Sequence, residues 1–248
     1  MPLGLTLGGF FFCTSKTDVT APQQCGAVTA SSPSPCRLNG VGYNTTANVD
    51  EYSSIIFGAS FDDIANPGVI PFTALNCPEG FEDEDQIQTP YTDERGVTKM
   101  HVYWYFGEWL DEEYNPVEDD AGIALGKAAW FLSSSAKHIT TSGEVKKGNH
   151  IHTFTESSEL VTSAFPVAFC PNSENVSWGV SDESQIQTAY TDERGVTKMH
   201  VYWYFGEWLD EEYNTLDPKV SVAGPGDGFW LLLSDASETF TEVGPLGE

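Results

Sequence analysis

Basic residues are scarce in this sequence. Eleven lysines and arginines stand against 37 aspartates and glutamates, which gives a formal net charge of −26. A surface of that charge repels phosphate backbones and anionic lipid headgroups, so we expect no nucleic acid partner. Long apolar runs are missing as well, because even the apolar start, MPLGLTLGGFFF, is shorter than the roughly 20 residues of a membrane-spanning helix. We therefore expect no membrane insertion.

Signatures of common enzyme classes are also missing. The sequence has no GxSxG, no Walker sequence and no HExxH, and the glycine-rich stretch 223–230 lacks the Lys-Ser/Thr of a phosphate loop. The repeated FGEWLDEE places Glu108 and Glu207 beside tryptophans, as in a glycosidase cleft. Both glutamates fall in an apparent hairpin turn, however, and two copies of one active site are unusual in a small chain. We expect a protein that is not an enzyme and needs no cofactor, with glycoside hydrolysis as the weakest alternative.

Cysteine is present, but without metal-binding spacing. None of the five cysteines forms a CxxC pair, and no histidine stands at zinc-finger spacing from them. Cys25 and Cys36 bracket a Ser/Pro-rich stretch that closes easily into a loop, so they are disulfide candidates if the chain is exported. The alternative is that all five are small buried hydrophobic residues.

The most unusual feature is an internal repeat. Residues 83–115 align with residues 182–214 at an offset of 99, and only two pairs differ: Asp85/Ser184 and Pro90/Ala189. Weaker likeness continues beyond this block. A period of about a hundred residues is longer than that of most solenoids, so it indicates tandem domains. The stretch KKGNH is the expected joint between them.

Each unit of the repeat is predicted to be β. The stretch TKMHVYWYF alternates with period two, which places two sets of side chains on opposite faces of a strand: Met100, Val102, Trp104 and Phe106 on one, and His101, Tyr103 and Tyr105 on the other. A tight turn at 107–108 leads into a return strand. The best helix candidate, 118–130, is weak. We predict an all-β fold with an N-terminal extended segment (1–39) and two β-sandwich or barrel-like units (40–147 and 148–248).

Acidic side chains gather at the end of each repeat. If the strand pattern continues there, three oxygen-bearing residues of each copy fall on one side: Asp111, Glu113 and Asn115 in the first, and Asp210, Glu212 and Asn214 in the second. Converging oxygen ligands suit a hard cation such as calcium. The sequence has no DxDxDG loop, so a solvated acidic face is the preferred interpretation and calcium is the alternative. His150 and His152 could share a metal, but no third ligand is visible, and solvated linker histidines are the simpler interpretation.

Four short motifs are similar to those of a known type of protein. GVGYN at 40–44, EYSSIIFGASFDDI at 51–64, GDGFW at 226–230 and GEV at 143–145 resemble the repeat units of secreted tandem β-repeat surface proteins of environmental bacteria. The first unit departs from that pattern with GKAAW, and the second unit ends on TEV. The resemblance implies an extracellular or cell-surface location and a structural or adhesive role. It brings no catalytic residues.

The apolar N-terminal segment suggests a mode of assembly. Its large side chains would line one extended strand: Leu3, Leu5, Leu7, Phe10, Phe11 and Phe12. Ten extended residues reach roughly 33 Å, enough to run along the open sheet edge of a neighbouring subunit. Our first hypothesis is an extracellular filament subunit that polymerises with copies of itself by β-strand addition. The second is a secreted carbohydrate-binding or adhesive module whose Tyr and Trp strand faces bind glycans.

Overall fold

The computed structural model describes residues 41–47, 54–60, 68–135, 137–194, 196–235 and 238–245. Within these ranges the chain is all-β, as predicted, and every strand pair is antiparallel. The helical structure there is limited to one turn, η1 (Phe72–Ala74). Helices long and apolar enough to cross a membrane are absent from this part of the chain.

The first unit builds three sheets from its described strands, in the orders β2-β8-β4-β5-β6, β1-β9 and β3-β7. The strands are β1 (Val41–Ala47), β2 (Ser54–Gly58), β3 (Val69–Pro71), β4 (Gln86–Thr92), β5 (Thr98–Tyr105), β6 (Trp109–Leu110), β7 (Gly122–Ala124), β8 (Ala128–Leu132) and β9 (His138–Glu144).

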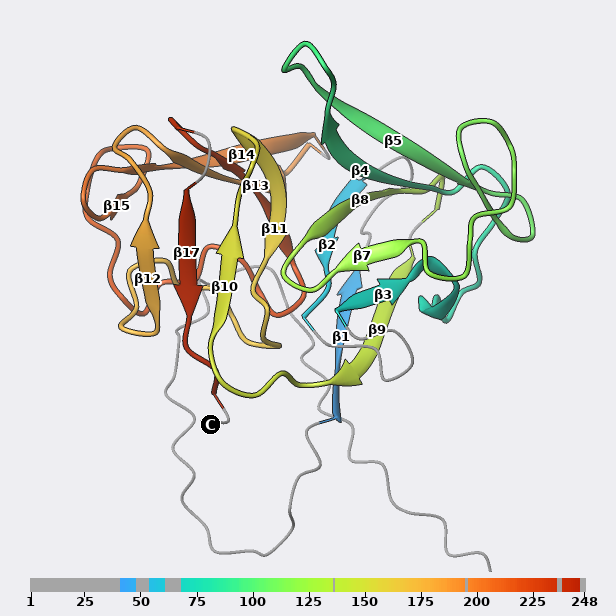
Figure 1. Ribbon diagram of the computed structural model, residues 1–248, viewed down its shortest axis with the longest axis horizontal. Helices are drawn as coiled ribbons and strands as arrows, with labels where there is room; N and C mark the ends of the chain where they lie inside the picture. The colour runs from blue at the N-terminus through green and yellow to red at the C-terminus, as the bar shows by residue number, and fades with distance from the viewer. Residues whose placement is uncertain are drawn as a thin grey trace, which may run out of the picture.

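The second unit repeats this plan with a five-stranded sheet, β11-β16-β13-β14-β15, and a three-stranded sheet, β10-β17-β12. Its strands are β10 (His150–Thr153), β11 (Ser158–Thr162), β12 (Val176–Gly179), β13 (Gln185–Thr191), β14 (Thr197–Tyr204), β15 (Trp208–Leu209), β16 (Gly228–Leu232) and β17 (Thr239–Glu242). The two units lie side by side, the first in blue to green and the second in yellow to red (Figure 1).

Alternation along the strands builds a separate core in each unit. On β8, Ala129 and Phe131 are fully buried, whereas Trp130 and Leu132 between and after them stay half-buried on the opposite face. Phe131 packs with Ile87 and Trp109 in the first core, and the second unit has a matching cluster around Phe229. Each fully buried aromatic or aliphatic side chain contributes about 1.5–3 kcal/mol, so these clusters hold the sheets together.

The predicted helix at 118–130 is wrong. Its residues form β7, a tight turn and β8. The turn is closed by the Lys127 N–H, which donates to the Ala124 carbonyl (2.8 Å), and Gly126 adopts a φ of 79° that favours glycine. A left-handed residue cannot continue an α-helix, so the apolar residues on either side become strands.

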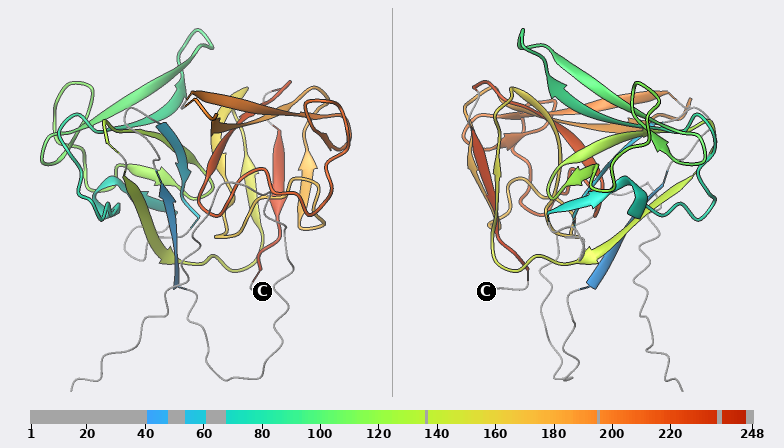
Figure 2. Two further views of the ribbon diagram at one scale, coloured as in Figure 1. Left: turned by 180° about the vertical axis from the view of Figure 1, so that it is seen from behind. Right: turned by 45° about the vertical axis from the view of Figure 1, so that its right-hand side comes forward.

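Two hairpins carry the repeated block. The β4–β5 turn is organised by Asp93, whose Oδ1 accepts the N–H groups of Arg95 (2.9 Å) and Val97 (3.0 Å). This hairpin projects beyond the body of the molecule (Figure 2). The tight turn predicted at 107–108 is present between β5 and β6, where Gly107 has a φ of 79°.

A reciprocal seam joins the two units. The Gly58 N–H of β2 donates to the Gly226 carbonyl (2.9 Å), and the Thr162 N–H of β11 donates to the Gly126 carbonyl (3.1 Å). β2 and β11 are equivalent strands, as are the turns that hold the two glycines. Each unit therefore makes the same contact with the other, as in an isologous interface between two subunits.

Small residues allow this close approach. A Cβ added at Gly228 would lie 2.4 Å from Cγ2 of Ile56, and one added at Gly58 would lie 2.2 Å from Cβ of Thr162. An apolar cluster of Ile56, Ala128 and Leu160 fills the seam. The units thus pack directly on one another.

Candidate functional site

The outward faces of the two five-stranded sheets carry tryptophans next to glutamines. Trp104 stands opposite Gln86 across the β4–β5 ladder, and Trp130 stands opposite Gln88 across the β4–β8 ladder. The second unit repeats both pairs. All four indoles are half-buried rather than enclosed. We call this surface the Trp–Gln face and define it by Gln86, Gln88, Trp104, Trp130, Gln185, Gln187, Trp203 and Trp230.

Strand alternation explains why these indoles face outward. Tyr103 and Tyr105 point into the first core, where the ring of Phe72 lies 4.6 Å from that of Tyr103 and Phe81 lies 5.3 Å from Tyr105. Trp104 lies between them and so belongs to the other face. The two faces predicted for this strand are therefore the two observed. Trp109 is 4% exposed and belongs to the core instead.

Side-chain hydrogen bonds hold the glutamines in place. Gln88 Nε2 donates to Gln86 Oε1 (3.0 Å), and Gln187 Nε2 donates to Gln185 Oε1 at the same distance. Each primary amide has two N–H donors and two acceptor sites, so one shared bond leaves most of the capacity of the pair for a ligand. The face thus offers oriented polar groups between aromatic rings.

The Trp–Gln face continues across the seam. A hollow of about 250 Å³ is lined by residues of both units: Gln88, Met100, Trp130, Leu132 and Trp230. At the far end of each sheet the aromatic surface extends to exposed rings. Phe106 lies 6.2 Å from Tyr114, and Trp203 lies 6.4 Å from Tyr213. The hollow therefore brings Trp130 of the first unit and Trp230 of the second to one surface at the seam.

Sequence reasoning found two of the eight residues of this face. The alternation of TKMHVYWYF pointed to Trp104 and Trp203. Trp130, Trp230 and the four glutamines were not predicted. QIQT alternates with period two, but AAWFL and GFWLL are apolar apart from one glycine, so no alternation marks Trp130 and Trp230. The pairing order of the strands decides that these residues share a face.

The proposed calcium ligands fall in a tight turn, so the assumed strand pattern is wrong there. Asp111 Oδ1 accepts the N–H groups of Glu113 (2.8 Å) and Asn115 (2.9 Å), and these backbone hydrogen bonds lower the pKa of Asp111. The second copy repeats the turn with Asp210, Glu212 and Asn214. In the described ranges no group of three or more His, Cys, Asp or Glu side chains is placed to hold a metal ion. Calcium stays a prediction, and the observed role of the two aspartates is to close the turns.

The expectation of solvated linker histidines is wrong. Both histidines lie in β10, and His152 is 3% exposed. Its Nε2 lies 2.6 Å from Glu242 Oε1, and Ser163 Oγ donates to Glu242 Oε2 (2.6 Å). Burial lowers the pKa of His152 and takes that of His150 to about 3. His152 is therefore buried and His150 half-buried, and both rings lie against the turn at Gly126 of the first unit.

Other predicted residues lie apart from the Trp–Gln face. Glu108 and Glu207 are exposed in the β5–β6 and β14–β15 turns and line no part of the hollow at the seam. Cys77 is a buried free thiol whose pKa is raised by burial, and Cys170 is disulfide-bonded. Two predicted sets lie outside the described residues: the disulfide candidates Cys25 and Cys36, and the assembly strand Leu3, Leu5, Leu7, Phe10, Phe11 and Phe12.

No protein-family model, curated protein or solved structure matches this chain. The resemblance to secreted tandem β-repeat surface proteins is therefore still a prediction.

Proposed function

We propose that this protein is a secreted, non-enzymatic module that binds glycans through the Trp–Gln face. The observation that carries the proposal is the position of four half-buried tryptophans on the sheet faces away from the two cores, each directly opposite a glutamine. Trp130 and Trp230 also pack on the seam cluster. An outward strand face normally carries polar side chains, and large half-exposed aromatic surfaces mark binding sites.

The chemistry of the face fits a neutral sugar polymer. Indole rings supply flat apolar surface for the C–H faces of sugar rings, and the primary amides can both donate to and accept from hydroxyl groups. A net charge of −26 disfavours uronic and sulfated glycans, because like charges repel. The face carries the same two Trp–Gln pairs in each unit, which favours a repeating ligand, since the second contact is intramolecular once the first has formed.

A disulfide supports secretion. Cys170 is disulfide-bonded, and structural disulfides form and persist mainly in oxidising compartments outside the cytosol. The acidic surface keeps such a protein soluble.

Paired tryptophan variants test the proposal. The double variants Trp104→Ala/Trp203→Ala and Trp130→Ala/Trp230→Ala should each weaken binding to a retained polysaccharide by at least about tenfold, because an aromatic contact of roughly 1.4 kcal/mol corresponds to a factor of ten. Affinity electrophoresis and depletion assays over a panel of neutral and acidic polysaccharides measure this effect.

Ile151→Ala is the matched control, because Ile151 is 63% exposed on β10 of the smaller sheet. It should bind like the wild type, and circular dichroism should show all variants folded. Binding of no polysaccharide, or equal binding by folded double variants and wild type, would contradict the proposal.

A second candidate function is assembly into extracellular filaments with copies of the same chain. The observation that favours it is the edge position of β10, which pairs with β17 alone among the described strands and exposes Ile151. An open edge with exposed β-branched residues is a template for an added strand. The apolar segment within residues 1–15 is the proposed donor.

Deletion of residues 1–15 tests this assembly. Electron microscopy should show filaments for the full chain and monomers for the deletion variant. Ile151→Lys, which places a charge on the β10 edge, should shorten the filaments. Filaments of unchanged length from the deletion variant would refute the donor role.

A further inference from the structure

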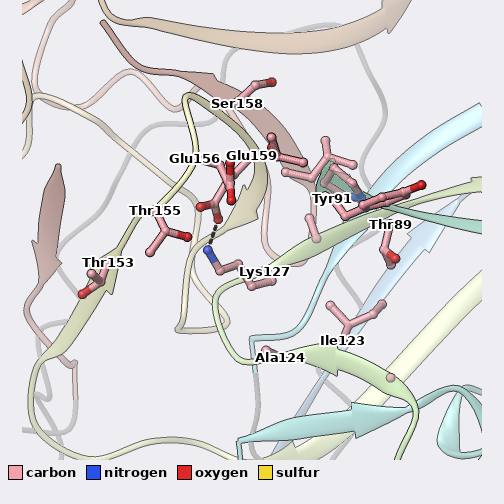
Figure 3. Close-up of a pocket in the computed structure, with 15 residues that line it drawn as sticks. Thr89, Tyr91, Ile123, Ala124, Lys127, Thr153, Thr155, Glu156, Ser158 and Glu159 are labelled. Atoms are coloured by element: carbon pink, nitrogen blue, oxygen red, sulfur yellow. Dashed lines mark hydrogen bonds and ion pairs between the residues drawn. The ribbon is translucent and has the colours of Figure 1, made fainter. Parts of the chain in front are cut away.

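A second hollow lies between the units. It shares no lining residue with the Trp–Gln face, although Ala128 and Leu160 of the seam cluster line it. It has a volume of about 460 Å³, which is within the usual range for small-molecule sites. The first unit contributes Thr89 and Tyr91 from β4, Ile123 and Ala124 from β7, and Lys127. The second unit contributes the opposite wall from the segment 153–160 (Figure 3). We call this hollow the inter-unit cleft.

An ion pair crosses the inter-unit cleft. Lys127 of the first unit points to Glu159 of the second, and the two side chains form a hydrogen-bonded pair (Figure 3). The Lys127 ammonium group also lies 4.9 Å from the centre of the Phe154 ring, which helps to hold it. A donor-only group and an acceptor-only group therefore stand together on one surface of the cleft.

The remaining lining combines hydroxyl groups with one aromatic ring. Five hydroxyl side chains also line the cleft: Thr89, Thr92, Thr153, Thr155 and Ser158. His101 stacks on Tyr91 at 4.0 Å with an interplanar angle of 17°, which fixes the tyrosine ring in the wall. The walls thus combine these hydroxyl groups with apolar side chains such as Ile123 and Leu160, and Glu156 adds a negative charge near the ion pair.

This arrangement is specific to one side of the molecule. Gly126 and Gly226 are equivalent in the seam, so Asp227 occupies the place that Lys127 has in the first unit. Pro90, one of the two residues that differ between the repeated blocks, lines the cleft, whereas its counterpart Ala189 packs on the seam cluster. One of the two differences between the repeated blocks therefore lies at the cleft.

We propose that the inter-unit cleft binds a single neutral sugar ring. Two neighbouring hydroxyls of a sugar can accept a hydrogen bond from the Lys127 ammonium group and donate one to the Glu159 carboxylate at the same time, because each hydroxyl is both donor and acceptor. The Tyr91 ring covers an apolar face of the sugar. The choice of ligand class rests on the proposed glycan-binding function, but the cleft is separate from the Trp–Gln face.

Free monosaccharides are the probe. Saturation-transfer NMR on the full chain with glucose, galactose, mannose, xylose and N-acetylglucosamine, each at millimolar concentration, should give a signal for at least one sugar. Tyr91→Ala and Glu159→Gln should each reduce that signal by about tenfold, as expected for the loss of roughly 1.4 kcal/mol.

Tyr190→Ala is the matched control. Tyr190 stacks on His200 at 4.0 Å and 14°, as Tyr91 does on His101, but it does not line the cleft. It should leave the signal unchanged. Because Glu159 joins the two units, thermal unfolding must show that Glu159→Gln is folded. Tyr91→Ala tests sugar binding independently, because Tyr91 lies on the projecting hairpin.

Each outcome decides between the two sites. A signal that is lost in Tyr91→Ala and Glu159→Gln but kept in Trp130→Ala/Trp230→Ala supports the cleft. A signal lost in the tryptophan variant alone places the sugar on the Trp–Gln face and overturns the cleft proposal while keeping the proposed function. Absence of any signal, or a signal that none of these variants changes, also overturns it.

Discussion

One backbone N–H group is satisfied in different ways in the two units. In the first unit the Glu82 N–H donates to Asp85 Oδ2 (2.8 Å), and Asp85 lies 3.6 Å from the buried Lys137 ammonium group. In the second unit the equivalent Ser181 N–H donates to Glu238 Oε1 (2.6 Å). Lys137 and Glu238 each directly precede the last strand of their unit. The carboxylate therefore comes from different elements, and this explains why Asp85 is replaced by Ser184.

Ser184→Asp should destabilise the protein by about 2–4 kcal/mol, because it places a second carboxylate beside Glu238 in a buried site. The double variant Ser184→Asp/Glu238→Lys should recover much of this loss, since it recreates the pairing of the first unit. Ser184→Asn is the neutral control of similar size. Chemical denaturation measures all three. Equal free energies of unfolding for Ser184→Asp and Ser184→Asn would exclude the charge explanation.

At the residue scale, the sequence predicted on which side of a strand a side chain lies better than it predicted which residues contact one another. Alternation placed Trp104 and Tyr103 on opposite sides of a strand, because period two follows from the backbone itself. It could not predict that Asp111 closes a turn, since the acidic cluster fits a strand, a turn or a cation site equally well. The buried Asp85–Lys137 pair also escaped prediction, because 52 residues separate the partners in sequence.

At the scale of elements, β10 carries two histidines, of which His152 is buried and His150 is half-buried. His150 and His152 contact each other edge to face at 4.4 Å, and the ring of His152 stacks on Phe240 of β17 at 3.9 Å. The charged groups that act on them are Glu242 of β17, Glu159 of β11, and Lys127 and Lys146 from the adjoining loops. The network fixes β10 against β17 and against the turn at Gly126, whose added Cβ would lie 2.6 Å from His152 Cε1.

Acid should weaken this element. Burial holds the pKa of both histidines below 6.5 in the folded state, so the unfolded chain binds more protons than the folded chain once the pH falls below about 6.5. The free energy of unfolding must then decrease as the pH falls. We expect the melting temperature of His150→Gln to decrease less between pH 7.5 and pH 5 (roughly the range that histidine titration covers) than that of the wild type.

Ile151→Gln, an exposed and non-titrating change between the two histidines, is the control and should keep the wild-type pH dependence. Asp227 acts in the opposite direction, because burial raises its pKa to about 6 and the folded state gains a proton there. Asp227 is present in every variant, so the difference between variants isolates the histidine contribution. Parallel curves for His150→Gln and wild type would rule out this source of acid sensitivity.

Elements were predictable where local chemistry dominates. Strands with β-branched and aromatic alternation, and turns with glycine at positive φ, were both expected and found at β5 and Gly107. The helix expected at 118–130 does not form, because Gly126 adopts a positive φ and makes a turn within the stretch of apolar residues. The prediction that His150 and His152 are solvated was wrong for a different reason. A polar residue in a linker-like sequence gives no sign that a neighbouring strand will cover it.

At the scale of the whole molecule, the arrangement of the two units was beyond the reach of the sequence. The repeat predicted two units, but not a seam formed by Ile56, Ala128 and Leu160, because small apolar residues in strands fit either a core or an interface. The Trp–Gln face and the inter-unit cleft both depend on that seam, which brings Trp130 close to Trp230 and Lys127 close to Glu159. Each unit carries its own half of the Trp–Gln face, whereas the inter-unit cleft needs both units.

The reciprocal hydrogen bonds at Gly58 and Thr162 have a consequence for how chains can meet. The two units make equivalent contacts at the seam. The first unit of one molecule can therefore pack against the second unit of another molecule with the same hydrogen bonds. Such an exchange keeps every internal contact and alters only the path of the connection near residue 147. Two molecules joined in this way would carry two Trp–Gln faces in one dimer without forming any new type of interface.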